Sequence, residues 1–223
     1  MIIPAWNEEA VIEGCLLSLR SQEEPWEAVV VDGGSSDRTR EVASRHGRVV
    51  LAPKGRGVQL NAGAAAARGG ILLFLHADCR LGPGGLREAR RVLALSGVKG
   101  GCFPQRIAKR SPLYRFVERG ASFRARRLGI VYGDSALFLR REVFERCGGF
   151  PSVPLFEDFG ISQRLKMIPG RVALASSWVE VSPRRWETRG FFRTTFLNWR
   201  LQAHYLTGAS PETLARRYEK AGR

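Results

Sequence analysis

An acidic residue ends an apolar run in the segment EAVVVDGGSSDRT, residues 27–39, where Asp32 precedes two glycines and two serines. This order predicts a buried strand, a sharp turn and the start of a helix. A carboxylate in this position serves three classes of enzyme: NAD enzymes, methyltransferases and nucleotide-sugar transferases. Other parts of the sequence must therefore decide which chemistry Asp32 serves.

Two of these classes fit the sequence poorly. An NAD site needs the spacing G-x-G-x-x-G between a strand and a helix. The nearest match is GRGVQL at residues 55–60, where Leu60 stands in place of the third glycine. A methyltransferase needs a glycine-rich turn after its first strand, but the first apolar run here ends in PAWNEE.

The first half of the chain alternates apolar runs with helical spacing. After a short first strand at residues 1–3, strands are expected at 27–31, 48–52 and 71–75, and helices at 11–19, 37–46, 58–68 and 86–96. This alternation predicts a Rossmann-like, mostly parallel sheet with helices on both faces. Ligands of such sheets bind beyond the carboxyl ends of the strands.

The second half is less regular. Helices are expected at residues 113–128, 141–147, 157–167 and 192–206, and strands at 135–140 and 172–181. The helix at 192–206 has an apolar stripe with a basic tail after it, and we expect the stripe either to pack on the sheet or to meet a membrane surface. The stripe consists of Phe192, Phe196, Trp199, Ala203 and Leu206.

The charge of the chain is uneven. Its 223 residues carry a net charge of +15, and residues 106–127 and 184–223 supply most of it. Such an excess favours anionic partners, namely phosphates, nucleic acid or a membrane. Nucleic acid is not expected, because few aromatic residues lie among the basic ones and no RNA- or DNA-binding module is recognisable.

The four cysteines form no C-x-x-C pair, which predicts reduced thiols in a cytoplasmic protein, with Cys79 in a packing role. No apolar run approaches the ~20 residues that a membrane-spanning helix needs. We therefore expect a cytoplasmic protein that either is soluble or lies on the inner membrane face as a peripheral protein. Because the first strand is so short, the native start is an open question.

Five motifs taken in order carry a family resemblance: PAWNEE, VVVDGGSSDRT, LLFLHAD, LFEDFGIS and SPRRW. They resemble the family 2 glycosyltransferases, whose fold is called GT-A, from Met1 to about Trp199. The segment GRGVQLNAGAAAARG, together with HAD, is similar to a small bacterial branch known as arsenosugar-type glycosyltransferases. The resemblance implies a GT-A catalytic domain at residues 1–190, with a nucleotide-binding half (1–105) and an acceptor half (106–190). A C-terminal amphipathic helical extension follows at residues 191–223.

The resemblance implies that the first two loops bind the nucleotide, with Pro4, Ala5, Asn7 and Glu8 at the base and ribose. Asp32 matches the acid that hydrogen-bonds the edge of the base. A carboxylate only accepts hydrogen bonds, so Asp32 suits either uracil or guanine, and hence a UDP- or GDP-sugar. In the alternative interpretation, Asp32 forms the turn by accepting bonds from the backbone of residues 34 and 35.

Two further residues resemble those that approach the nucleotide or its diphosphate, namely Arg56 and Asn61. A guanidinium forms a planar fork that suits phosphate oxygens. The alternative for Arg56 is that it is a solvated loop residue.

The segment His76-Ala77-Asp78 occupies the place of the family's DxD motif. Asp78 is expected to bind Mg²⁺ or Mn²⁺ together with phosphate oxygens. His76 is expected to lie behind this ligand, on the side of the diphosphate and acceptor.

Glu157 and Asp158 match the family's ED motif, whose second acid is the general base for displacement with inversion. Adjacent residues on a helix point ~100° apart, so only one of them can face the substrate, and we assign the base to Asp158. In the alternative interpretation, both acids simply complement the helix dipole.

Arg185 and Trp186 stand in the place of the family's QxxRW motif, in which Ser182 replaces the glutamine. This loss argues against a processive polymerase, while Arg185 suits the leaving diphosphate and Trp186 a sugar ring. Gly133 and Asp134 resemble residues of the acceptor side.

The sequence therefore predicts a non-processive, inverting glycosyltransferase that uses a nucleotide-diphospho sugar and Mg²⁺ or Mn²⁺. Its acceptor is a hydroxyl or phosphate compound, either a lipid-linked phosphate or a small soluble molecule. The alternative is a basic nucleotide- or RNA-binding module without catalysis.

Overall fold

The computed structural model describes residues 1–222, with side chains described up to Tyr218. Its central sheet has the order β3-β2-β1-β4-β8-β6-β9, in which a bridge between Ile2 and Phe74 joins β1 to the chain that follows β4. Strand β8 is antiparallel to both of its neighbours, and the other pairings are parallel. The strands are β1 (Ile2–Ala5), β2 (Val29–Asp32), β3 (Arg48–Leu51), β4 (Ile71–Leu73), β6 (Val98–Cys102), β8 (Phe138–Arg140) and β9 (Arg171–Leu174).

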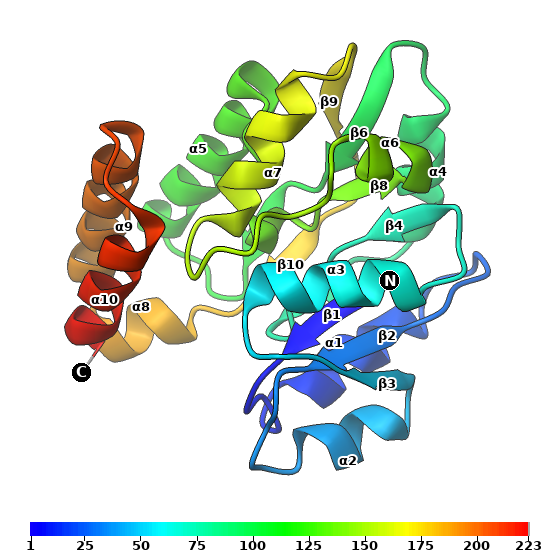
Figure 1. The fold of residues 1–223 in the computed structure, drawn as a ribbon, viewed down its shortest axis with the longest axis horizontal. Helices are drawn as coiled ribbons and strands as arrows, with labels where there is room; N and C mark the ends of the chain where they lie inside the picture. The colour runs from blue at the N-terminus through cyan, green and yellow to red at the C-terminus, as the bar shows by residue number, and fades with distance from the viewer. Residues whose placement is uncertain (223) are drawn as a thin grey trace.

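Helices cover both faces of this sheet (Figure 1). One face packs against α1 (Ile12–Leu19), α2 (Thr39–Ser44) and α4 (Gly85–Leu93). The other face packs against α3 (Arg56–Ala66), α5 (Pro112–Leu128), α6 (Arg141–Arg146) and α7 (Glu157–Lys166). The doubly wound, mostly parallel architecture predicted from the sequence is thus confirmed.

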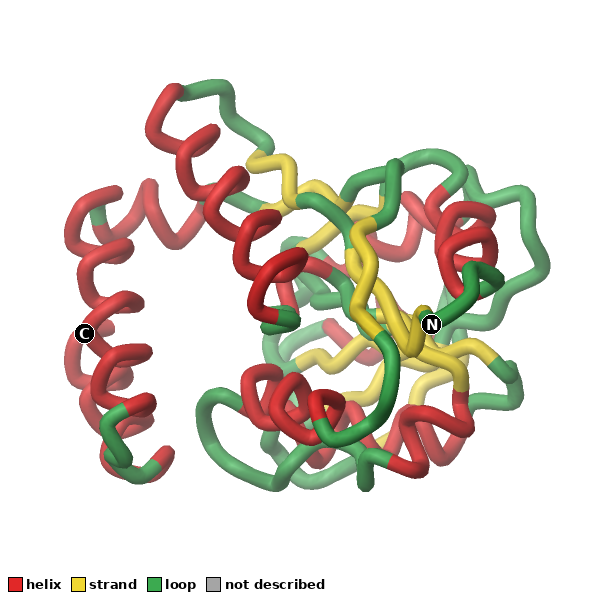
Figure 2. Tube along the Cα trace, turned by 90° about the horizontal axis from the view of Figure 1, so that it is seen from above, coloured by secondary structure: helices red, strands yellow, loops and turns green. Residues whose placement is uncertain are grey.

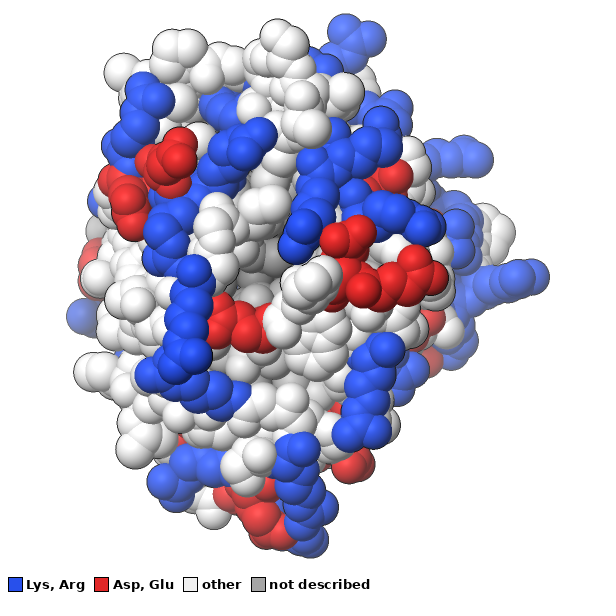
Figure 3. All heavy atoms as spheres, turned by 90° about the vertical axis from the view of Figure 1, so that its right-hand side faces the viewer, with Lys and Arg blue, Asp and Glu red and all other residues white. Residues whose placement is uncertain are grey.

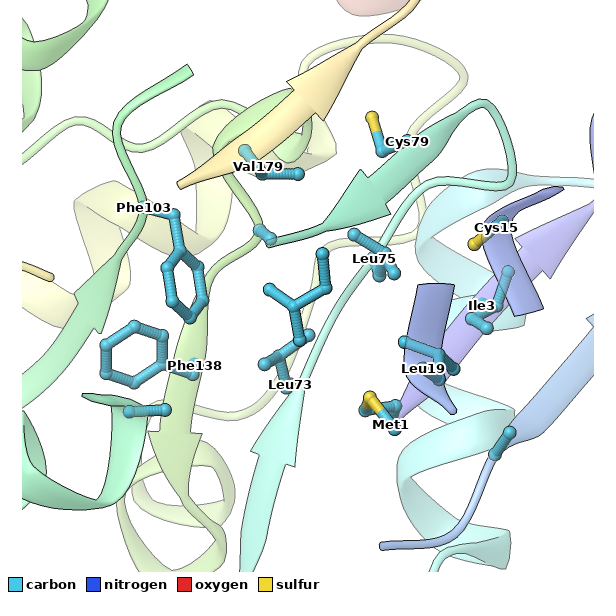
Figure 4. Packing of buried hydrophobic residues seen from close by; sticks show 14 of the residues in the cluster. Met1, Ile3, Cys15, Leu19, Leu73, Leu75, Cys79, Phe103, Phe138 and Val179 are labelled. Atoms are coloured by element: carbon cyan, nitrogen blue, oxygen red, sulfur yellow. The ribbon is translucent and has the colours of Figure 1, made fainter. Parts of the chain in front are cut away.

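The hydrophobic core lies in two layers, because successive residues of a strand point to opposite faces. Ile3 packs on the α1 side and Ile2 on the α3 side, and both are fully buried. Figure 4 shows the first layer, where Ile3 and Leu75 lie near Cys15 and Leu19 of α1. All four cysteines are free and buried, and Cys79 packs in this layer, as expected.

A second, smaller sheet has the order β5-β10-β7, formed by β5 (Cys79–Leu81), β10 (Val179–Val181) and β7 (Gln105–Ile107). The prediction of one strand over residues 172–181 is therefore wrong, since β9 and β10 belong to different sheets. Ser176 and Ser177 lie between β9 and β10, and the bonds below are not strand-pairing bonds. Ser176 N–H donates to Glu88, and the Ser177 hydroxyl donates to the Pro83 carbonyl. Strands β5, β6 and β7 were not predicted. Strands β5 (CRL) and β7 (QRI) have only three residues each, which is too few to show a pattern, and β6 (VKGGC) contains two glycines, which are uncommon in strands.

Three helices form the C-terminal side of the molecule: α8 (Arg184–Arg189), α9 (Phe191–Leu206) and α10 (Pro211–Gly222). Figures 1 and 2 place α9 beside α10, apart from the central sheet. Their contact is a small cluster of Leu197, Leu201 and Leu214, packed on Leu155 and Phe156. Helix α8 was not predicted from the sequence, and α10 lies within the helical extension that the sequence predicts over residues 191–223.

The apolar stripe of α9 does not pack on the sheet, which corrects one of the two expectations for it. Phe192, Phe196 and Trp199 are 74%, 64% and 57% exposed. The helix instead turns its Leu197 and Leu201 face inward. Among the described residues, no helix combines the length and the apolar character needed to cross a membrane.

Two helical glycines provide a matched test of this packing. A Cβ atom at Gly63 of α3 would lie 2.3 Å from Ile2 Cγ2 and 2.8 Å from Val31 Cγ2, whereas one at Gly120 of α5 would meet no atom within 4 Å. We expect Gly63→Ala to lower the free energy of unfolding by about 1–3 kcal/mol, because the core there is already filled. Gly120→Ala should raise it by roughly 0.5–1 kcal/mol. Urea denaturation measures both, and an unchanged midpoint for Gly63→Ala would contradict the close contact of α3 with the sheet.

Candidate active site

The loops after β1 and β2 are locked together by hydrogen bonds. Asn7 N–H donates to Ser35 Oγ over 2.9 Å, and Ser36 N–H donates to Asn7 Oδ1 over 2.9 Å. Asn7 has a φ of 54°, which Asn tolerates better than most residues. Its side chain therefore holds this edge of the sheet together, while Pro4 and Ala5 are buried within β1.

Asp32 adopts its turn-forming alternative. Its carboxylate has no exposed surface and accepts bonds from the N–H groups of Gly34 and Ser35, both over 3.0 Å. Arg40 Nε lies 3.9 Å from Asp32 Oδ2, and because the carboxylate has no exposed surface, a direct contact with a base requires neighbouring groups to move aside. Sequence reasoning missed Gln59, a buried residue whose Nε2 donates to the carbonyls of Ala5 and Val31 at the same edge.

The segment after β4 brings Asp78 close to basic residues of α8. Burial alone would raise the pKa of Asp78, but His76 in its protonated form, together with the charges of Arg185 and Arg184, holds this pKa below its ordinary value. Burial and the neighbouring Arg56 lower the pKa of His76 to about 3, so His76 is neutral near pH 7.

Glu8 joins this group from the loop after β1. Its Oε2 lies 3.3 Å from Arg184 Nη2, and burial and the charge of Asp78 raise the pKa of Glu8. Acids and arginines from three elements thus meet at the carboxyl ends of β1 and β4.

Asp78 is the residue most suited to a divalent cation. Among the described residues, no three His, Cys, Asp or Glu side chains gather closely enough to enclose a metal ion. Mg²⁺ needs only one or two carboxylates when phosphate oxygens complete its coordination. The side chains present therefore fit a cation that a bound diphosphate helps to hold, and they do not form a complete protein site.

The two acids at the start of α7 have different partners, as their helical positions require. Glu157 is 2% exposed and pairs with Arg56 Nη1 over 3.0 Å. Asp158 Oδ2 accepts the N–H of Gly133 over 3.0 Å, and its Oδ1 accepts the N–H of Phe159 over 2.7 Å. Burial and the charge of Glu157 raise the pKa of Asp158 to about 7.

Gly133 lies between Asp158 and His76. It begins the short 3-10 turn η1 (Gly133–Ser135), and a Cβ atom there would lie 2.1 Å from His76 Nε2. Only glycine fits this contact. In the same turn, Asp134 Oδ1 accepts a bond from Gln105 Nε2 over 2.5 Å, and burial raises the pKa of Asp134.

These acids line a groove of about 400 Å³ between the start of α7 and helices α5, α8 and α9. The sequence predicted eight of its lining residues: Arg56, His76, Gly133, Asp134, Glu157, Asp158, Arg185 and Trp186. Others were missed because only the tertiary fold brings them here: Gln105, Phe116, Arg124, Tyr132, Thr195 and Gln202.

Two predicted positions also have structural contacts. Arg56 Nη1 pairs with Glu157, and the Arg56 side chain is 38% exposed and lines the groove. The Asn61 amide donates to the Phe150 carbonyl over 2.8 Å and accepts the Phe150 N–H over 2.9 Å. These bonds hold α3 to the loop after α6, and a contact of either residue with the nucleotide stays a prediction.

Known proteins similar to this chain are glycosyltransferases. The model of the family "Glycosyl transferase family 2" matches residues 1–147. The glycosyltransferase AglE of Haloferax volcanii is 29% identical over 171 residues, covering 68% of this chain and 55% of the relative. A dolichyl-phosphate beta-glucosyltransferase, ALG5A of Trichomonas vaginalis, is 34% identical over 95 residues, covering 35% of this chain and 29% of the relative. The chain thus spans about half or less of the length of these relatives.

Solved structures share the fold. TarS of S. aureus, residues 1–349, superposes with a TM-score of 0.68 at 19% identity, over 88% of this chain and 64% of that one. The mannosyltransferase PcManGT of Pyrobaculum calidifontis, in complex with GDP-Man and Mn²⁺, gives 0.64 at 24% identity, over 78% and 55%. The fold is the GT-A fold predicted from the sequence, and the chain belongs to glycosyl transferase family 2.

Proposed function

We propose that this chain is an inverting, non-processive glycosyltransferase that moves a sugar from a UDP- or GDP-sugar to an acceptor O–H. The observation that carries the proposal is the position of Asp158, a half-buried acid that accepts the Gly133 N–H in a groove that Arg56 and Arg185 also line. A module that only binds a nucleotide does not need an acid in this position, whereas an enzyme that removes a proton from an acceptor does. Membership of the arsenosugar-type branch remains part of this proposal.

In this proposal, the diphosphate of the donor binds near Asp78. Arg184 and Arg185 lie on the same side, and a guanidinium suits phosphate oxygens. Mg²⁺ or Mn²⁺ bound with the donor would neutralise charge on the diphosphate as it leaves. The relative PcManGT was solved with GDP-Man and Mn²⁺, which supports a donor and a cation of this kind.

Asp158 is proposed to take the proton from the acceptor. As the acceptor oxygen bonds to the anomeric carbon, the bond from that carbon to the diphosphate oxygen breaks, and the nucleoside diphosphate leaves with the electron pair. A base is most effective when its pKa is near the working pH, and burial raises the pKa of Asp158 to about 7. Glu157 is unsuited to the role, because Arg56 neutralises it.

A thermal-shift panel identifies the donor. Bound ligand raises apparent stability by mass action, so at equal concentration the UDP- or GDP-sugar that binds most tightly with Mn²⁺ should raise the melting temperature most. If no nucleotide sugar binds or is turned over with Mn²⁺ or Mg²⁺, the proposed activity is wrong.

We expect transfer to depend on deprotonated Asp158. Activity should therefore rise as the pH passes through about 7, because the pKa of Asp158 is raised to that value. Asp158→Asn should lower kcat by roughly 10²–10⁴-fold. Initial rates of nucleoside diphosphate release between pH 5 and 9 measure both effects, with melting curves to confirm folding.

The matched control is Glu142→Gln, which likewise changes a carboxylate to its amide at an exposed acid on α6 and should retain wild-type rates. Full transfer by Asp158→Asn would show that the base has been assigned to the wrong residue.

A peripheral membrane contact is the second part of the proposal, because α9 leaves its apolar stripe exposed. Helix α5 adds the exposed rings of Phe116 and Phe123, and residues 106–127, which include most of this helix and the chain before it, carry eight basic residues against one acid. Aromatic rings beside cations suit the interface of an anionic bilayer. On the opposite face of the molecule, basic and acidic side chains are interspersed (Figure 3).

We expect the protein to sediment with phosphatidylglycerol vesicles in low salt and to be released as salt increases. The double variant Phe192→Ser, Phe196→Ser should weaken this binding at least severalfold, because both rings are exposed on α9. Leu51→Ser, at a residue that is 65% exposed on β3, is the control and should bind normally. If the wild type shows no salt-dependent binding to these vesicles, the proposed membrane contact is wrong.

A further inference from the structure

Helix α5 borders a second groove, of about 590 Å³, with a different set of residues from those that line the groove of Asp158. We call it the arginine groove, because five arginines line it: Arg106, Arg115, Arg119, Arg126 and Arg127. None of the residues proposed above for the donor or for catalysis lines this groove. The proposed sugar transfer therefore leaves the arginine groove without a role.

The positive charge of the arginine groove is largely uncompensated. Among the described residues that line it, the only acid is Glu118, whose Oε2 pairs with Arg115 Nη1 over 2.6 Å. The other carboxylate oxygen of Glu118 accepts the N–H of Ile107 over 2.7 Å. Within residues 1–218, the other four arginines of the groove form no ion pair. Like charges gathered in this way repel one another, so the groove suits an anionic ligand.

The arginines that α5 supplies to the groove form two groups along the helix. Arg115 and Arg119 are four residues apart and hence neighbours on one helix face. Arg126 and Arg127 form the second group, which begins seven residues beyond Arg119, or about 10 Å further along the helix axis. A guanidinium binds a phosphate through short, paired N–H bonds. Two groups at this separation suit two phosphates better than one.

The small sheet supplies the fifth cation. Arg106 belongs to β7, and its guanidinium carbon lies 4.7 Å from the ring centroid of Trp178, which also lines the groove. Stacking on a ring restrains a guanidinium but leaves its N–H edge available for phosphate oxygens. The cations thus come from a helix and from a strand of the small sheet, so the groove is more than one basic face of a helix.

Exposed aromatic rings lie beside these cations. Phe123 lines the arginine groove and is 63% exposed, while Phe116 and Trp199 line the groove of Asp158 and are 65% and 57% exposed. Such rings suit the interface of a bilayer, and basic pockets at membranes bind headgroups that carry several phosphates. Single-stranded nucleic acid is a weaker match, because its bases stack on open aromatic faces and Arg106 already covers one face of Trp178.

We infer that the arginine groove binds the headgroup of an anionic lipid that carries two phosphodiesters. This inference rests on the membrane contact in the proposed function, because it names the lipid and the residues that select it. Arg119 and Arg126 are the selecting residues, one from each group on α5. A lipid bound here places the bilayer beside the groove of Asp158, since α5 borders both grooves.

Vesicle co-sedimentation at matched surface charge tests the inference. One set of vesicles contains cardiolipin, with two phosphodiesters per molecule, and the other contains phosphatidylglycerol, with one, at twice the mole fraction. The wild type should bind the cardiolipin vesicles severalfold more tightly, whereas attraction by charge alone would make the two equal. The double variant Arg119→Ala, Arg126→Ala should lower the affinity for cardiolipin vesicles at least about tenfold and remove the preference.

The matched control is the double variant Arg68→Ala, Arg146→Ala, which removes the same charge from two exposed arginines outside the groove. It should keep the preference for cardiolipin, and melting curves confirm that both double variants fold. If the alanine variant of Arg119 and Arg126 does not fold, Arg119→Lys with Arg126→Lys decides the question. This pair keeps the charge and loses the planar fork, so it should lose part of the preference. A preference that survives either change at Arg119 and Arg126 in full would contradict the inference.

The outcomes separate the inference from the membrane contact on which it rests. Equal binding of the wild type to both vesicles would overturn the inference and leave the membrane contact standing. Binding to cardiolipin vesicles alone would support the arginine groove and overturn a general contact with anionic bilayers, and binding to neither would overturn both. Release from cardiolipin vesicles by a single-stranded oligonucleotide at equal phosphate concentration would show that the lipid is the wrong occupant and indicate nucleic acid.

Discussion

The buried ion pair between Arg56 and Glu157 is the contact on which the site depends. It joins the start of α3 to the start of α7 over 3.0 Å, two helix starts that are about one hundred residues apart in the chain. Glu157 is almost fully buried, and an unpaired charge there would be strongly destabilising. With Glu157 neutralised, Asp158 is the acid of the pair left for chemistry, and the Gly133 N–H fixes its position.

The sequence predicted the sheet and much of the site because the relevant signals are local. Apolar runs followed by acids mark the strand ends, and parallel strands bring those ends to one edge. The position of Asp158 in an ED motif could be read from the sequence in the same way. The roles of Asn61 and Arg56 could not, because their partners Phe150 and Glu157 are 89 and 101 residues away.

The C-terminal helices show the limit of periodicity most clearly. The spacing of Phe192, Phe196 and Trp199 correctly predicts a helix with an apolar face. Periodicity does not say which face is buried, and here the face with Leu197 and Leu201 packs on the body of the protein. Arg124 carried no signal either, since seven other basic residues share its segment and only burial in the groove sets it apart.

The central claim is direct displacement, with Asp158 as the base and no covalent intermediate on the protein. Proton NMR of a donor with an α-linked sugar tests this directly, with water as the acceptor, because the first-formed anomer of the released sugar is visible before it mutarotates. The account predicts that the β anomer appears first. Initial release of the α anomer would contradict it, since retention requires a second displacement.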